Sequence, residues 1–118
     1  MYITGGSTDH ITPWHACYRS TQLFGGPVTF VLSTAGHIQS VLNPPQNSKR
    51  KYYLNPDHGP DHHKWLAGAE EHDGSWWPHW YEWVELRGGE WRDAPEDLGS
   101  DAHPELCAAP GNYVLDPS

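Results

Sequence analysis

Apolar residues in the first third of the chain form two short strand-like runs separated by a helical pattern. Residues 2–4 (Tyr-Ile-Thr) are β-prone, and residues 28–32 (Val-Thr-Phe-Val-Leu) form a continuous apolar run typical of a parallel strand covered on both faces. Between them, Thr12 is a suitable helix N-cap, Pro13 suits the first helical turn, and Gly25-Gly26 ends the helical spacing. Strand, helix and strand in this order predict a βαβ unit with two parallel strands.

The pattern beyond this unit predicts two helices and a tail. We expect one helix over residues 61–70 and another from Ser75, as its cap, to Leu86, with an apolar face made almost entirely of tryptophan. Such a stripe usually packs inward, although contact with a hydrophobic polymer is the alternative. Residues 92–118 are rich in Pro, Gly and acids and predict an extended tail lying over the body. Residues 1–91 would thus form part of one domain, to which the tail also belongs.

Two residues with acid and base chemistry follow the predicted strands. Asp9 comes after the first strand and His37 after the second, and the carboxyl ends of parallel strands meet at one edge of a sheet. We therefore expect their side chains to lie together. In α/β-hydrolases the triad runs in the order nucleophile, acid, histidine, and Asp9 and His37 suit the last two places. The alternative is that Asp9 caps a turn and His37 packs in a loop.

Length and charge exclude several functions. The chain has 118 residues, enough for one small domain or part of one, and two parallel strands alone would leave its core incomplete. Seven Lys and Arg against fifteen Asp and Glu give a net charge of -8, which argues against binding nucleic acid. No run approaches the roughly 18 apolar residues of a transmembrane helix, and no signal-peptide pattern is present, so a cytoplasmic location is expected.

Histidine and cysteine are the remaining candidates for special chemistry. Residues 57–63, with His72 and His79, contain histidines and aspartates, but their spacing matches no closed structural zinc site. We predict a solvated loop and no metal there. Cys17 and Cys107 are expected to be free thiols, since chains without export signals rarely contain disulfides.

Several motifs are specific enough to indicate a family. Residues 6–14 (Gly-Ser-Thr-Asp-His-Ile-Thr-Pro-Trp), 36–40 (Gly-His-Ile-Gln-Ser) and 75–80 (Ser-Trp-Trp-Pro-His-Trp) closely resemble the carboxyl-terminal part of polyhydroxyalkanoate synthases. Residues 16–20, 30–33, 42–45 and 109–114 do so as well. The resemblance covers nearly the whole chain, in order.

The resemblance implies a fold, a reaction and site residues. These synthases have an α/β-hydrolase core and polymerise (R)-3-hydroxyacyl-CoA into polyester with release of CoA, using a Cys-His-Asp triad and no cofactor. Asp9 and His37 occupy the matching Asp and His positions. His10 would line the substrate path, while Ser33 and Gln39 would support the loop that carries His37.

One departure from the family pattern determines which activity we expect from this chain. The synthase nucleophile is the cysteine of Gly-x-Cys-x-Gly, and neither Cys17 nor Cys107 is flanked in this way. We therefore expect the nucleophile and oxyanion hole upstream of these residues, and no polymerase activity from the isolated chain.

The resemblance also implies partners. These are the acyl-CoA, the polyester chain, the amino-terminal part of the same enzyme, a second copy in a full-length homodimer, and the surface of a polymer granule. Two alternatives remain open. One is a non-catalytic module that binds a granule or synthase subunit, and the other is the end of a related esterase or depolymerase.

Overall fold

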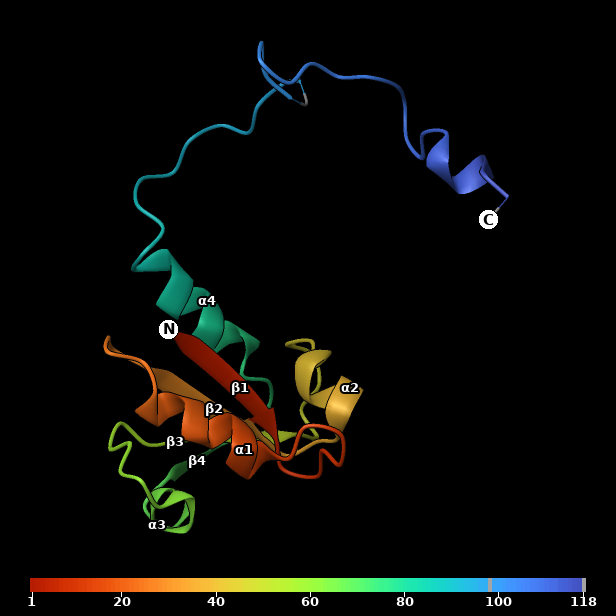
Figure 1. The fold of residues 1–118 in the computed structure, drawn as a ribbon. Coiled ribbons are helices and arrows are strands. Elements are labelled where there is room, and N and C mark those ends of the chain that lie inside the picture. Colours follow the sequence, from red (N-terminus) through yellow and green to blue (C-terminus); the bar gives the residue numbers. More distant parts are fainter. Residues whose placement is uncertain (98, 118) are drawn as a thin grey trace.

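The computed structural model describes residues 1–97 and 99–117 and contains a mixed four-stranded sheet with helices around it (Figure 1). Its strands, in spatial order, are β1 (Tyr2–Gly6), β2 (Thr29–Ser33), β3 (Lys51–Leu54) and β4 (Glu70–Asp73). β1 and β2 are parallel, whereas β3 and β4 each pair antiparallel with the preceding strand. The architecture is compatible with a piece of an α/β fold. The expectation of parallel strands alone is incomplete, because two antiparallel strands extend the sheet.

The predicted βαβ unit is present. β1 and β2 pair in register from Tyr2 with Thr29 to Gly6 with Ser33, and α1 (Trp14–Arg19), followed by the short 3-10 helix η1 (Ser20–Gln22), connects them. Thr12 does not cap α1, so that prediction was wrong. Pro13 holds the cap position, and the Thr12 hydroxyl donates a hydrogen bond to Asp9 instead.

β3 and β4 form a hairpin around α3 (His62–Ala67). The Asp61 carboxylate caps this helix by accepting hydrogen bonds from the backbone N–H groups of His63 at 2.9 Å and Lys64 at 3.3 Å. The helix ends earlier than predicted, because residues 70–73 form β4. This strand consists of Glu-Glu-His-Asp, so it has no apolar alternation to reveal it. It lies at the sheet edge, where polar residues are tolerated.

The alternation of side chains along the strands builds two packed faces. Phe30 and Leu32 of β2 pack with Tyr18 of α1 and Trp65 of α3 to form a buried aromatic core. The Phe30 ring centroid lies 5.2 Å from that of Tyr18 and 5.1 Å from that of Trp65, both edge-to-face. Tyr2, on the opposite face of β1, contacts α4 (Trp77–Glu85). α1 and α4 therefore cover opposite faces of the sheet.

The tryptophan stripe of α4 is divided between packed and exposed positions. Trp76, directly before the helix, is buried, and the Trp83 ring lies edge-on to Tyr2 with centroids 5.5 Å apart. Trp80 is 43% exposed. The helix begins close to the predicted start, and the Ser75 hydroxyl accepts a hydrogen bond from the Trp77 backbone N–H at 3.1 Å. Inward packing thus holds for part of the stripe.

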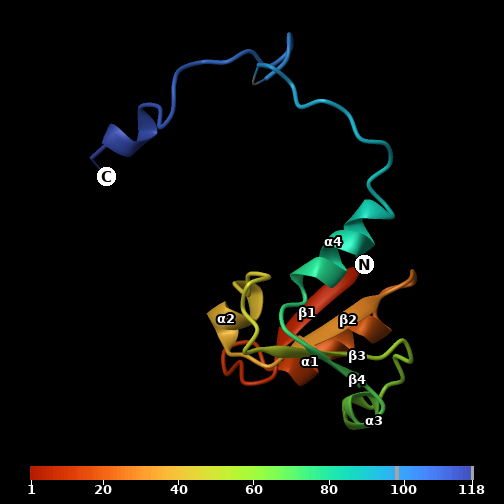
Figure 2. The same ribbon diagram turned by 180° about the vertical axis from the view of Figure 1, so that it is seen from behind.

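Beyond α4, the described residues 92–97 and 99–117 have little regular structure apart from a bridge between Ser100 and His103, a few turns and a short 3-10 helix, η2 (Tyr113–Leu115). Figures 1 and 2 show this tail running away from the sheet, so the prediction that it lies over the body was wrong. Nearly all of its residues are exposed, and their polar composition provides few contacts that could hold it on the sheet. Among the described residues, no helix has the length and apolar character needed to cross a membrane.

Candidate active site

Asp9 and His37 lie side by side at the carboxyl ends of the parallel strands. The Asp9 Oδ2 atom is 2.8 Å from His37 Nδ1. Asp9 lies in the loop after β1, and His37 is the first residue of α2 (His37–Val41), shortly after β2. The backbone N–H of Ser7 donates to the Ser33 carbonyl at 2.8 Å, which ties the first loop to the end of the second strand. The βαβ crossover therefore brings the pair together.

Hydrogen bonds fix both oxygens of the Asp9 carboxylate. Oδ1 accepts from the backbone N–H groups of Ile11 and Thr12, each at 2.9 Å, while Oδ2 accepts from the Thr12 hydroxyl at 2.6 Å as well as facing His37. The Asp9 side chain is only 4% exposed. Burial raises the pKa of Asp9, but the hydrogen bonds from Thr12, His37 and Ile11 outweigh it and hold the pKa well below its ordinary value.

Thr12 is the site residue that the sequence interpretation missed. Its hydroxyl donates to Asp9 and lies 3.5 Å from His37 Nδ1, so it touches both members of the pair. The available signal was the spacing Asp-x-x-Thr, because an aspartate often accepts hydrogen bonds from residues two or three positions ahead. The same Thr, directly before Pro13, also has the sequence pattern of a helix cap.

The protonation of Asp9 decides how His37 can react. An ionised carboxylate only accepts hydrogen bonds, so His37 Nδ1 must carry the proton and donate it. In a neutral imidazole, Nε2 is then the atom with the free lone pair. The His37 side chain is 44% exposed. The pair is therefore arranged as a carboxylate that orients a general base.

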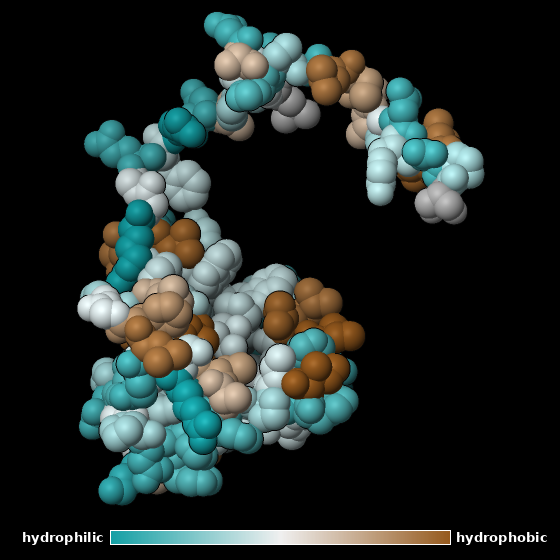
Figure 3. All heavy atoms as spheres, in the orientation of Figure 1, coloured by the Kyte–Doolittle hydropathy of each residue, from teal (hydrophilic) through white to brown (hydrophobic). Residues whose placement is uncertain are grey.

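A cavity of about 310 Å³ adjoins the pair and is largely apolar on one side. Asp9, Thr12 and His37 line it together with Ile38, Val41 and Leu42 of the α2 region. These three apolar residues are also exposed, and Figure 3 shows apolar side chains gathered over this part of the molecule. The cavity could accommodate an apolar group beside His37.

The other residues named from the sequence lie around the pair rather than in it. His10 is exposed and is not among the residues that line the cavity. The Ser33 side chain is buried, and among the described residues its hydroxyl has no hydrogen-bond partner. Gln39 accepts a hydrogen bond from Arg50. Ser33 supports the loop through its backbone carbonyl, and Gln39 through Arg50, which also donates to the Thr34 carbonyl at 3.3 Å.

The two cysteines are free thiols in different surroundings. Cys17 lies on α1, and its Sγ is 3.8 Å from the Thr12 carbonyl oxygen. Burial raises the pKa of the Cys17 thiol, and the negative charge of Asp9 raises it further, so the reactive thiolate is disfavoured. Cys107 is exposed in the tail. In the part of the chain that the structure describes, no three His, Cys, Asp or Glu residues are grouped closely enough to hold a metal ion.

Comparison with known proteins supplies the context for this geometry. Poly(3-hydroxyalkanoate) polymerase 1 of Ectopseudomonas oleovorans is 48% identical over 114 residues, which are 97% of this chain and 20% of that protein. The poly(3-hydroxyalkanoate) polymerase subunit PhaC of Cupriavidus necator is 44% identical over 113 residues, or 96% of this chain and 19% of that protein. The resemblance to polyhydroxyalkanoate-polymerising enzymes is confirmed.

A polymerase with lower identity to this chain matches over nearly the same share of it. The PhaC polymerase subunit of Rhizobium etli is 39% identical over 116 residues, covering 98% of this chain and 18% of that protein. The chain thus spans about a fifth of the length of the curated relatives it matches. No protein-family profile matches the chain.

Proposed function

We propose that this chain provides the acid and the base of a Cys-His-Asp acyltransferase that polymerises (R)-3-hydroxyacyl-CoA. Asp9 is the acid and His37 the base, set on the end of an α/β-hydrolase-type sheet. The observation that carries the proposal is the 2.8 Å contact between Asp9 Oδ2 and His37 Nδ1. The similarity to poly(3-hydroxyalkanoate) polymerases supports the choice of reaction over that of an esterase or depolymerase.

The proposed chemistry assigns His37 the proton transfers of two successive acyl transfers. Nε2 removes the proton of a cysteine thiol, and the resulting thiolate attacks the thioester carbonyl of the acyl-CoA. When the tetrahedral intermediate collapses, the bond to the CoA sulfur breaks, and His37 returns its proton to CoA, which leaves as a thiol. His37 then removes the proton of the 3-hydroxyl that attacks the enzyme-bound acyl group. The bond to the cysteine sulfur breaks, an ester bond joins the two units, and His37 returns the proton to the cysteine. Asp9 holds the imidazole in orientation and stabilises its protonated form.

Cys17 and Cys107 are unsuited to the role of nucleophile. Cys17 has a raised thiol pKa and lies on α1, and Cys107 lies in the exposed tail. We propose that the cysteine and the oxyanion hole come from the amino-terminal part of the polymerase, with which this chain must assemble. The isolated chain would then be inactive. The proposed reaction needs no cofactor other than the acyl-CoA substrate.

Complementation tests this function directly. The chain is mixed with the amino-terminal portion of a homologous polymerase, assembly is verified by size-exclusion chromatography, and CoA release from 3-hydroxybutyryl-CoA is followed. We expect release from the mixture and not from the chain alone. Asp9→Asn and His37→Gln should each lower the rate about 10³-fold or more, since triad members act as a unit.

Matched controls make the same chemical changes away from the site. Asp93→Asn and His103→Gln alter exposed tail residues and should leave the rate unchanged. A verified complex that releases no CoA, or that tolerates Asp9→Asn and His37→Gln as well as it tolerates the controls, would contradict the proposal.

A further inference from the structure

The helix that carries His37 is too short to hold its own position. α2 has five residues, whereas isolated helices shorter than about 12 residues are marginal in water. The local backbone supplies donors for only part of its last turn: the Ile38 carbonyl accepts from the Leu42 N–H at 2.9 Å and the Val41 carbonyl from the Asn43 N–H at 3.0 Å, so further donors must come from elsewhere. Such donors would determine where the helix lies, and with it the imidazole of its first residue.

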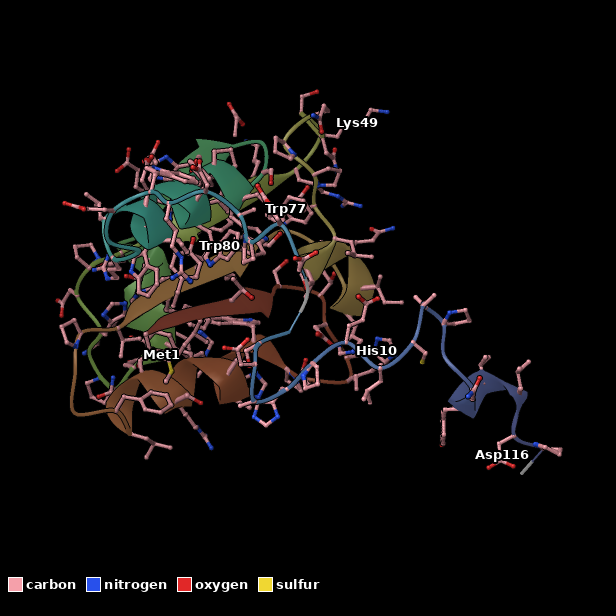
Figure 4. All side chains as sticks on the ribbon, turned by 90° about the horizontal axis from the view of Figure 1, so that it is seen from above. Met1, His10, Lys49, Trp77, Trp80 and Asp116 are labelled. Atoms are coloured by element: carbon pink, nitrogen blue, oxygen red, sulfur yellow. The ribbon has the colours of Figure 1, made fainter. Side chains whose placement is uncertain are left out.

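Three consecutive residues before and at the start of α4 provide these donors. Trp76 Nε1 donates to the Ser40 carbonyl at 2.7 Å, and Trp77 Nε1 donates to the Val41 carbonyl at 2.9 Å. The Ser75 hydroxyl donates to the Asn43 carbonyl. Figure 4 shows Trp77 between α4 and α2. The Ser-Trp-Trp segment (residues 75–77) thus binds the last two carbonyls of α2 and the Asn43 carbonyl just beyond the helix.

The same turn is linked to His37 and to β1 from the other side. The Ser40 hydroxyl donates to the His37 carbonyl at 3.0 Å, so a residue held by Trp76 itself holds the backbone of the base. Ser40 also packs against Gly6, where an added Cβ would lie only 2.9 Å from the Ser40 Cβ. The α2 turn is therefore fixed between the end of β1 and the indoles.

We infer that Trp76 and Trp77 are positioning residues for His37, acting through their indole N–H groups rather than through apolar packing alone. The inference rests on the proposed role of His37 as the base. It predicts that removing an indole N–H while keeping an aromatic ring loosens α2 and weakens the Asp9–His37 hydrogen bond. An exposed tryptophan of the same helix should lack this effect.

The test uses Trp76→Phe and Trp77→Phe, with Trp80→Phe as the matched control. Proton NMR of the ¹⁵N-histidine-labelled chain follows the His37 Nδ1 proton and the pH titration of the ring. We expect both Trp76→Phe and Trp77→Phe to broaden or shift that proton upfield and to alter the titration, while Trp80→Phe reproduces the parent spectrum. In the assembled polymerase, both variants should lower kcat about tenfold with little change in KM, because a displaced base reduces turnover.

Two features of this experiment distinguish a wrong inference from the misfolding of a variant and from an incorrect proposed function. Trp77 is partly exposed, so Trp77→Phe carries the test if Trp76→Phe does not fold, as judged by circular dichroism. Folded Trp77→Phe with an unchanged His37 signal would overturn the inference. The NMR readout is independent of turnover, so it stays decisive even if Asp9→Asn and His37→Gln show that the proposed reaction is incorrect.

Discussion

The Thr12 hydroxyl donates to the same Asp9 oxygen that faces His37 Nδ1. One carboxylate oxygen is thus shared between a fixed donor and the imidazole, while the other accepts two backbone N–H groups. This arrangement keeps Asp9 ionised although it is almost completely buried. Hydrogen bonds within its own loop therefore hold the Asp9 carboxylate in place even without the contact to His37.

Replacing Thr12 should weaken this hold on Asp9. Thr12→Val removes the hydroxyl donor at nearly constant volume, so the pKa of Asp9 should rise. Asp9 has a lowered pKa in the folded chain, so its ionisation stabilises the fold above the unfolded pKa of about 3.9 and this contribution is lost as the pH falls through the folded pKa. The variant should therefore gain a smaller contribution from Asp9, and the loss of that contribution should be complete at a higher pH within the acid range.

The measurement for Thr12 is a ¹³C NMR titration of the Asp9 carboxylate, together with acid unfolding. Thr12→Ser keeps the hydroxyl and serves as the control, with a titration close to that of the parent chain. Equal Asp9 titrations in the Val and Ser variants would show that the hydroxyl does not stabilise the carboxylate.

The burial of His79 should make stability depend on pH near neutrality. The Tyr2 hydroxyl lies 2.8 Å from His79 Nδ1 and joins α4 to β1. Burial lowers the pKa of His79, Glu82 opposes this shift, and His72 adds to it. A histidine with a lowered folded pKa stabilises the fold fully above its unfolded pKa of about 6.5, and this stability is lost as the pH falls through the folded pKa.

Urea unfolding at several pH values between about 8 and 5 measures this dependence. We expect His79→Phe to make the profile less steep, since the variant has no imidazole at position 79, while His58 and His62, whose pKa values burial also lowers, retain part of the dependence. His103→Phe changes an exposed histidine of the tail and should keep the parent slope. A profile that stays as steep in His79→Phe would assign the dependence to another group.

The two buried serines near His37 should respond in opposite ways to alanine. The Ser33 hydroxyl is buried without a hydrogen-bond partner among the described residues, so Ser33→Ala removes an unsatisfied group and should stabilise the chain by up to about 1 kcal/mol. The Ser40 hydroxyl donates to the His37 carbonyl, so Ser40→Ala should destabilise it by about 1 kcal/mol. Chemical denaturation of both variants gives the comparison, and a large loss in Ser33→Ala would reveal a role for its hydroxyl.

Gly6 should be intolerant of a side chain. A Cβ at this position would lie 2.6 Å from the Ala35 carbonyl oxygen and 2.9 Å from the Ser40 Cβ, so Gly6→Ala must displace the turn that leads into α2. We expect a loss of about 1–3 kcal/mol in unfolding free energy. Gly25→Ala is the control, because nothing lies within 4 Å of its Cβ position. Similar stability of the two variants would contradict the close packing.

The sequence predicted the parts of the fold that depend on local patterns. The apolar run of β2 and the helical spacing around Trp14 and Tyr18 were sufficient for the βαβ unit, and that unit places Asp9 beside His37. The polar strand β4 was missed because an edge strand needs no apolar face. That Asp9 and His37 are catalytic remains a prediction.

Contacts between distant residues were not predictable in the same way. The hydrogen bonds of Trp76 and Trp77 join residues 36 positions apart, and no spacing in the sequence indicates which carbonyl an indole will bind. Thr12 shows a different difficulty. Its hydroxyl had two plausible roles, accepting from the backbone N–H groups at the helix start or donating to Asp9, and only the three-dimensional structure distinguishes them.

β1 is one of the two edge strands of the sheet, opposite β4, and its carboxyl end leads into the loop of Asp9. An edge strand offers backbone N–H and C=O groups for pairing with another strand. Neighbouring strands lie about 4.8 Å apart, so a strand added there would end directly beside the cavity of His37. The pairing of another polypeptide with this edge would then complete the reaction centre in the same step.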